Sequence, residues 1–361
     1  MSIERIVVYR IWLALFGLFL ALSALAAEPA AKPGQFLGGM ATEYPAWFKE
    51  GFLNLGDDIA EARAAGKRLL LIFHQNNCPY CNALVERNLS QQDIEAAVRK
   101  QFDVVAINMW GDRELTGLDG KTYTEKSFAA ANKVQFTPTI LFFDETGQVV
   151  LRLNGYLPPA RFKTAIDYVG QHREKAMSFR DYAAAHEPAP AKGEMHQENF
   201  FRPAPFDLGR LGNAKGRPIA VFFEQKDCPA CDELHAKVLP DKATRQVIGK
   251  FHAVQLNMWG NDPVTLPDGR QTTAREWAKT LDVKYAPTIV LFDATGKEII
   301  RSEAFFKVFH TQGIFSYVDS GSYKKEPSFQ RYLEGRAETI RRTGKDVDIW
   351  RLADEPAGKR P

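Results

Sequence analysis

Two CxxC pairs constrain this chain most strongly, because they hold all four cysteines among its 361 residues. The first pair lies in CPYC at residues 78–81 and the second in CPAC at residues 228–231. Another phrase repeats at nearly the same spacing, since NMWG at 108–111 returns at 257–260. A repeat of about 150 residues is much longer than a solenoid unit of roughly 20–50 residues, so it indicates two duplicated domains.

The repeat and the composition between its copies set the predicted domain boundaries. The stretch HEPAPAKGEMHQENFFRPAP is rich in proline and alanine and has no apolar periodicity, which is typical of a linker. We therefore divide the chain into a signal peptide at 1–26, a first domain at 40–185, a linker at 186–205, a second domain at 206–335 and a C-terminal helix with a solvated polar tail at 336–361.

The N-terminus has the features of an export signal. Arg5 and Arg10 give a positive start, an apolar run follows at 11–25, and Ala-Leu-Ala at 24–26 fits the small-residue cleavage rule. An uncleaved membrane anchor is the alternative, but the run is shorter than the roughly 20 residues that a span prefers. We expect a cleaved, periplasmic protein without stable membrane insertion, in a compartment where paired cysteines form disulfides.

The charge pattern bears on partners. The net charge is only +3, and the basic residues are scattered among acidic ones. A nucleic-acid-binding protein usually concentrates basic residues in a patch or stripe. We therefore expect no nucleic-acid partner.

Each repeat has the same pattern of predicted elements. An apolar strand, at 69–73 in the first copy and 219–223 in the second, leads into the CxxC motif. A helix, a second strand, another helix, a strand pair and a closing helix follow. This order predicts an α/β fold with a central mixed sheet flanked by helices in each domain.

The CxxC pairs stand where a strand ends and a helix begins. Unpaired N–H groups and the positive dipole end of a helix stabilise a thiolate, so Cys78 and Cys228 are the predicted nucleophiles. Cys81 and Cys231 lie within the first helical turn, where each can resolve a mixed disulfide. A bridge across two residues adds little stability, which favours a chemical role.

A proline at the start of a later strand marks each domain a second time. Proline is disfavoured inside a sheet, so Thr137-Pro138 and Ala286-Pro287 are predicted to be cis peptides. Such a bend leaves a backbone carbonyl and N–H group near the sulfurs. We expect these four residues to bind an extended substrate.

With CPxC after a strand and a T/A-P-T proline about 60 residues later, each half resembles a thioredoxin-fold domain. The phrase FFEQKDCPACDELH in the second half resembles the SoxW-type periplasmic thioredoxins. The resemblance implies tandem thioredoxin domains in an exported thiol–disulfide oxidoreductase without a cofactor. It also implies protein disulfides as substrates and a membrane electron donor of the DsbD kind.

Some positions depart from the thioredoxin pattern. Thioredoxins have a buried carboxylate six residues before the first cysteine, where this chain has Ile72 and Phe222. His74 and Glu224, four residues before each pair, are the nearest titratable candidates for a proton relay. His235, on the helix after the second pair, is expected on the surface.

Other functions use the same residues. Within the oxidoreductases, two sites suit a disulfide isomerase as well as the reductase that the SoxW-type resemblance favours. Outside them, four cysteines can form a zinc site, and a CxxC pair with a histidine such as His310 can carry copper. Each pair opens a helix of its own domain, which argues against a shared zinc site. Copper carriers with a thioredoxin fold usually have a wider cysteine spacing, so we expect no metal.

Overall fold

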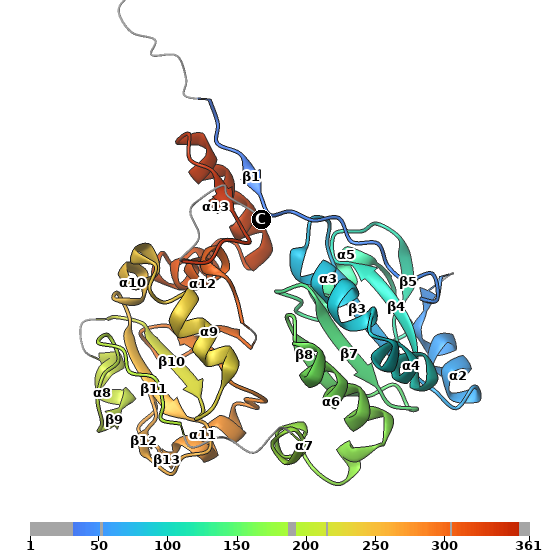
Figure 1. The fold of residues 1–361 in the computed structure, drawn as a ribbon, viewed down its shortest axis with the longest axis horizontal. Helices are drawn as coiled ribbons and strands as arrows, with labels where there is room; N and C mark the ends of the chain where they lie inside the picture. The colour runs from blue at the N-terminus through green and yellow to red at the C-terminus, as the bar shows by residue number, and fades with distance from the viewer. Residues whose placement is uncertain (1–31, 51–52, 187–192, 214–215, 304, 354–361) are drawn as a thin grey trace, which may run out of the picture.

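The chain forms two four-stranded sheets of the same topology, which lie side by side in Figure 1. The computed structural model describes residues 32–50, 53–186, 193–213, 216–303 and 305–353. The predicted signal peptide at 1–26 lies outside the described residues. The predicted α/β class with two central mixed sheets is confirmed.

The first sheet has the strand order β4-β3-β7-β8, with β3 parallel to β4 and β7 antiparallel to both neighbours. Its strands are β3 (Arg68–His74), β4 (Phe102–Asn108), β7 (Thr139–Phe143) and β8 (Val149–Asn154). Along β3, Leu70 and Ile72 join one apolar cluster, whereas Leu69, Leu71 and Phe73 join another. Both faces of the sheet are thus buried, which explains the continuous apolar run.

Helices cover the two faces of the first sheet. The helices of this half are α2 (Leu55–Ala64), α3 (Pro79–Ala83), α4 (Gln92–Gln101), α5 (Glu125–Ala131), α6 (Pro159–Gly170) and α7 (Phe179–His186), with a π-helical segment at Leu84–Leu89 and a 3-10 turn at Arg173–Lys175. Val98 of α4 and Ile166 of α6 pack on one face, and Ile59 of α2 and Phe128 of α5 pack on the other.

The second half repeats the first with the strand order β11-β10-β14-β15. Its strands are β10 (Ile219–Glu224), β11 (His252–Asn257), β14 (Thr288–Phe292) and β15 (Glu298–Ser302). Its helices are α8 (Leu208–Asn213), α9 (Pro229–Lys237), α10 (Lys242–Ile248), α11 (Ala274–Thr280), α12 (Val308–Asp319) and α13 (Phe329–Arg342), with a 3-10 turn at Ser322–Lys324.

Each half also carries a small three-stranded sheet. These sheets contain β2 (Leu53–Asn54), β5 (Glu114–Thr116) and β6 (Thr122–Thr124) in the first half, and β9 (Phe206–Asp207), β12 (Pro263–Thr265) and β13 (Gln271–Thr273) in the second. Since the small sheets repeat as well, the duplication involves the whole domain.

The C-terminal segment differs from the solvated tail that the sequence analysis expects. After α13, β16 (Val347–Asp348) pairs in parallel with β1 (Phe36–Leu37). Val347, Ile349 and Leu352 are buried in the apolar cluster of the second half. These apolar residues lie two or three positions apart in an otherwise polar segment, a spacing that gives little periodic signal.

The described part of the predicted linker packs on the second half. The ring of Phe201 lies 5.0 Å from that of Phe222, and the N–H of Gly193 donates to Asp227 Oδ1 at 3.0 Å. Residues 193–201 are therefore in contact with the residue just before the CPAC motif and with the strand that leads into it.

Candidate active site

Both CxxC pairs lie at the start of a helix, where the sequence analysis expects them. Cys78 is the N-cap residue of α3, and Cys228 is the N-cap residue of α9. In each motif the backbone N–H of the second cysteine donates to the sulfur of the first at 3.1 Å. Within each pair the two sulfurs are bonded as a disulfide. The local geometry supplies an N–H donor to each first sulfur, which stabilises a thiolate after reduction.

The predicted proline bends are cis and lie close to the sulfurs. Thr137-Pro138 and Ala286-Pro287 are both cis peptides. The hydroxyl oxygen of Thr137 is 3.3 Å from Cys78 Sγ, and its carbonyl oxygen is 3.7 Å away. In the second half, Ala286 shares an apolar cluster with both cysteines of the CPAC pair. The structure thus brings each cysteine pair together with its predicted proline loop.

The two proposed proton-relay positions have different surroundings. His74 is half-buried and its ring lies 4.6 Å from that of Tyr44. Burial lowers the pKa of His74 to about 4. Glu224 is only 1% exposed and accepts a hydrogen bond from Gln255 Nε2 at 3.0 Å. A neutral histidine therefore occupies the first position, and a buried carboxyl group the second.

The expectation that His235 is a surface residue is wrong. His235 is buried, and its Nε2 lies 3.1 Å from both carboxyl oxygens of Glu224. Its Nδ1 lies 3.1 Å from Glu198 Oε1. Burial by itself lowers the pKa of His235, but the hydrogen bonds to Glu224 and Glu198 outweigh it, so the net shift is upward.

The spacing of His235 from the second CxxC pair is a sequence signal for its place behind the active site. His235 stands four residues after Cys231 on α9, so the two side chains share one face of the helix. Val85 occupies the matching position in the first half. The second site thus has a histidine–carboxylate pair behind its resolving cysteine, and the first site has an apolar residue.

All four cysteines are buried. Cys78 is 2% exposed and Cys228 is 1% exposed, although each is the predicted nucleophile of its pair. Cys81 and Cys231 are buried as well. A nucleophile needs contact with its substrate, so the burial of these residues makes the covering groups part of the site.

The second half covers the CPYC motif. Tyr80, between the two cysteines, is 4% exposed, and its ring contacts those of Phe306, His310 and Trp350 at centroid distances of 5.8, 5.3 and 5.0 Å. Its hydroxyl oxygen accepts a hydrogen bond from the N–H of Lys307 at 3.0 Å. The histidine that a copper site would use is therefore packed against this motif.

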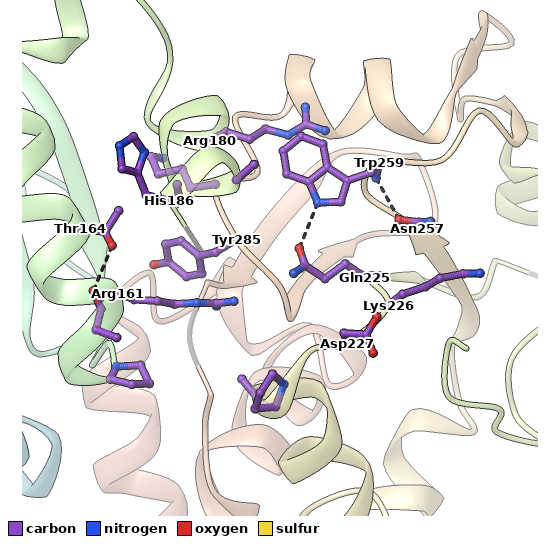
Figure 2. A pocket seen from close by; sticks show the side chains of 17 residues that line it. Arg161, Thr164, Arg180, His186, Gln225, Lys226, Asp227, Asn257, Trp259 and Tyr285 are labelled. Carbon is purple, nitrogen blue, oxygen red and sulfur yellow. Dashed lines mark hydrogen bonds between the residues drawn. The ribbon is translucent and has the colours of Figure 1, made fainter. Parts of the chain in front are cut away.

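The first half contacts the loops around the CPAC motif, whereas Pro229 of the motif itself is exposed. Arg161 of α6 donates to the carbonyl oxygen of Ala286 at 2.8 Å, so the backbone group expected to meet a substrate is occupied. Arg180 of α7 donates to the carbonyl oxygen of Met258 at 2.5 Å, and its guanidinium lies 4.2 Å from the ring of Trp259. Figure 2 shows these side chains meeting from the two halves.

The aromatic residue before each cis peptide crosses to the opposite half. Phe136 packs on Phe306 and Phe329 at centroid distances of 5.1 and 5.3 Å. Tyr285, its counterpart, belongs to the apolar cluster of the first half. The two proline loops are therefore buried by reciprocal contacts. Thr137, Pro138, Ala286 and Pro287 are all buried.

Among the described residues, no group of three or more His, Cys, Asp or Glu side chains is arranged to hold a metal ion. In the same part of the chain, every helix is too short or too polar to cross a bilayer.

Comparison with known proteins agrees with this geometry. The thioredoxin-like domain family matches residues 55–170 and 212–307, which is more than half of the chain. The chain therefore belongs to this family. It is a thioredoxin-like thiol–disulfide oxidoreductase with two CxxC pairs.

One curated relative is the thiol:disulfide interchange protein DsbD of Salmonella typhi, which is 33% identical over 90 residues. That alignment covers 24% of this chain and 14% of the relative, so the chain matches a small part of its length.

Two solved structures are also similar. A thioredoxin-fold protein from Helicobacter pylori is 22% identical, with a TM-score of 0.30, over 34% of this chain and 81% of that one. The first two thioredoxin domains of Saccharomyces cerevisiae Eps1p are 12% identical, with a TM-score of 0.23, over 71% of this chain and 93% of that one.

Proposed function

We propose that this chain is an exported reductase of protein disulfides that uses both CxxC pairs. The observation that carries the proposal is the position of each first sulfur. It caps a helix, accepts an N–H from the second cysteine and lies beside a cis-proline loop. These groups favour a thiolate that can attack a disulfide.

In the proposed reaction, the reduced thiolate of Cys78 or Cys228 attacks one sulfur of the substrate disulfide. A mixed disulfide forms, and the other substrate sulfur leaves as a thiolate that takes up a proton. Cys81 or Cys231 then attacks the first cysteine, and the second substrate sulfur leaves. Two electrons pass to the substrate, and the CxxC pair ends as the disulfide seen here.

The resolving thiol must lose its proton before it attacks. In the second half, the Glu224–His235 pair is the proposed acceptor, because His235 lies one helical turn beyond Cys231. In the first half, His74 is the proposed group, and burial keeps it neutral at pH 7. The two sites then handle protons with different groups.

Each sulfur must also become accessible. Because the opposite half covers both proline loops and the sulfurs are 2% exposed or less, we propose that the halves separate before exchange. The structure corresponds to the oxidised, closed arrangement of this cycle.

Re-reduction requires a dithiol donor of two electrons. We propose a membrane electron donor of the DsbD kind and a periplasmic location, which the export-type N-terminus supports. The likeness to part of a thiol:disulfide interchange protein is consistent with a partner that exchanges disulfides. Isomerase activity is the second candidate, because two CxxC sites occur in one chain.

Trapping the mixed disulfide tests the proposal. Cys81→Ser and Cys231→Ser should each hold a partner protein as a mixed disulfide that a reducing agent releases. A double Cys78→Ser/Cys228→Ser variant is the control and should hold none. If neither resolving-cysteine variant captures a partner and the wild type does not reduce insulin, the proposed function is wrong. Refolding of scrambled ribonuclease at a rate above that of insulin reduction would favour the isomerase.

A further inference from the structure

A cavity of about 680 Å³ lies between the two halves beside the CPAC motif. Pro229 and Ala230, the two residues between the cysteines, form part of its wall, and α6 and α7 of the first half form the opposite wall. Figure 2 shows the side chains of both halves around this space. The volume falls within the roughly 300–1,000 Å³ of ligand pockets in proteins.

Comparison of the two duplicated halves explains why the cavity lies beside the CPAC motif and not beside the CPYC motif. Three large side chains, Tyr80 of the CPYC motif with Phe309 and Leu333 of the second half, are buried in one apolar cluster. The repeat aligns these positions with Ala230, Ala160 and Ala183, and all three alanines line the cavity. At these three positions, a large residue on the CPYC side therefore aligns with an alanine on the CPAC side.

The packing around Tyr80 at the CPYC motif indicates what kind of group the cavity beside the CPAC motif can hold. Tyr80 occupies the first interface with its ring among aromatic groups and its hydroxyl bonded to the backbone N–H of Lys307. The wall of the cavity contains two aromatic groups of its own, Trp259 and Tyr285. An aromatic side chain from another molecule therefore matches the space that Ala230 leaves.

The charges around the cavity favour a ligand that carries an acidic residue next to its aromatic side chain. The lining contains the cations Arg161, Arg180, Lys226 and Lys284 and the single carboxylate of Asp227. Of these cations, Lys284 already pairs with Asp282, which is outside the lining, at 2.5 Å. Arg180 is 6% exposed, and within the described part of the chain its Nε has no hydrogen-bond partner. A buried donor without an acceptor is costly, and a carboxylate of the ligand would satisfy it.

We propose that this cavity, in the closed arrangement and before the halves separate, binds a peptide segment of the substrate protein, with an aromatic side chain in the space that Tyr80 fills in the other half and an acidic residue next to it. The proposal rests on the proposed function, since it assigns a substrate class to the CPAC site. It makes the two sites unequal, because Tyr80 occupies the corresponding space at the CPYC motif.

Calorimetric binding of cysteine-free peptides to the oxidised full chain tests the proposal without redox chemistry. The acetylated and amidated tetrapeptide AYDA should bind, and AADA should bind at least tenfold more weakly, or about 1.4 kcal/mol. AYKA should also bind more weakly, because its lysine meets the cations of the lining. Equal binding of AYDA and AADA would overturn the proposal.

Two variants fill the cavity from opposite walls. Ala183→Leu copies Leu333, and Ala230→Tyr copies Tyr80, so each should weaken AYDA binding at least tenfold. Ala185→Leu is the matched control, since this exposed residue of α7 does not line the cavity, and its Kd should stay within twofold of the wild type. Unchanged binding in both filled variants would place the peptide elsewhere and refute the assignment.

Insulin reduction by the wild type separates this proposal from the proposed function. Insulin reduction without AYDA binding would reject the peptide pocket and leave the reductase intact. AYDA binding that both filled variants abolish, in a protein that reduces no disulfide, would support the pocket and reject the reductase.

Discussion

Tyr80 provides the sharpest test of the closed arrangement. Its side chain lies within the CPYC motif but packs on Phe306, His310 and Trp350 of the other half. Replacing a buried aromatic residue with alanine typically costs about 3–5 kcal/mol. Because these contacts join the two halves, Tyr80→Ala should destabilise the closed arrangement and not the interior of either sheet.

The expected effect on the sulfur follows from that energy. A loss of about 3 kcal/mol shifts the opening equilibrium by roughly a hundredfold, since about 1.4 kcal/mol corresponds to a factor of ten. Cys78 is 2% exposed in the closed arrangement, so alkylation of its reduced thiol should accelerate by a similar factor. Mass spectrometry of the alkylated peptides, with iodoacetamide as the reagent and the fold monitored by circular dichroism, measures this rate.

Tyr80→Phe is the matched control. It keeps the ring and removes only the hydroxyl that accepts the N–H of Lys307, a bond worth about 1 kcal/mol. Its alkylation rate at Cys78 should therefore rise less than tenfold. If Tyr80→Ala leaves the alkylation rate of Cys78 within threefold of the wild type, the second half does not protect this sulfur and the reasoning is refuted.

Three further predictions concern pH and redox behaviour. The raised pKa of His235 stabilises the fold below the unfolded pKa of 6.5, so the free energy of unfolding should fall as pH rises above 6.5. His235→Gln should reduce that slope in urea unfolding, and an unchanged slope would contradict the pair with Glu224. Burial, with Arg336 nearby, lowers the pKa of His310 to about 4, so stability should fall by at most about 3 kcal/mol between pH 6.5 and pH 4. His310→Gln should reduce this fall in the free energy of unfolding between pH 6.5 and pH 4, measured by urea unfolding at each pH. Double serine variants that leave only the CPYC or only the CPAC pair should give different midpoints in glutathione redox buffers, because the residues between and behind the cysteines differ; equal midpoints would reject this.

Much of the fold and of the chemical site is encoded locally and was predictable. The apolar run before each CxxC motif predicts a strand buried on both faces. Pro79 and Pro229 fit the first turn of a helix, where a missing N–H has no cost. The prolines that align between the copies marked the two loops beside the sulfurs. Such signals lie within a few residues of each other, so a single sequence contains them.

The interface between the halves was decided only by the tertiary structure. Tyr80 bonds to Lys307 and Arg161 to Ala286, and each contact joins segments that are separate in the sequence. No periodicity within either segment indicates such a partner.

By itself, the sequence determined two domains of one fold and the positions of their cysteine and proline loops. The packing of the two domains decided which side chains cover those loops. It also decided that the alanine that aligns with Tyr80 leaves a cavity at one site. The physical reason is that strand, helix-start and turn signals act over neighbouring residues, whereas burial and cavity volume depend on groups that only the folded chain brings together.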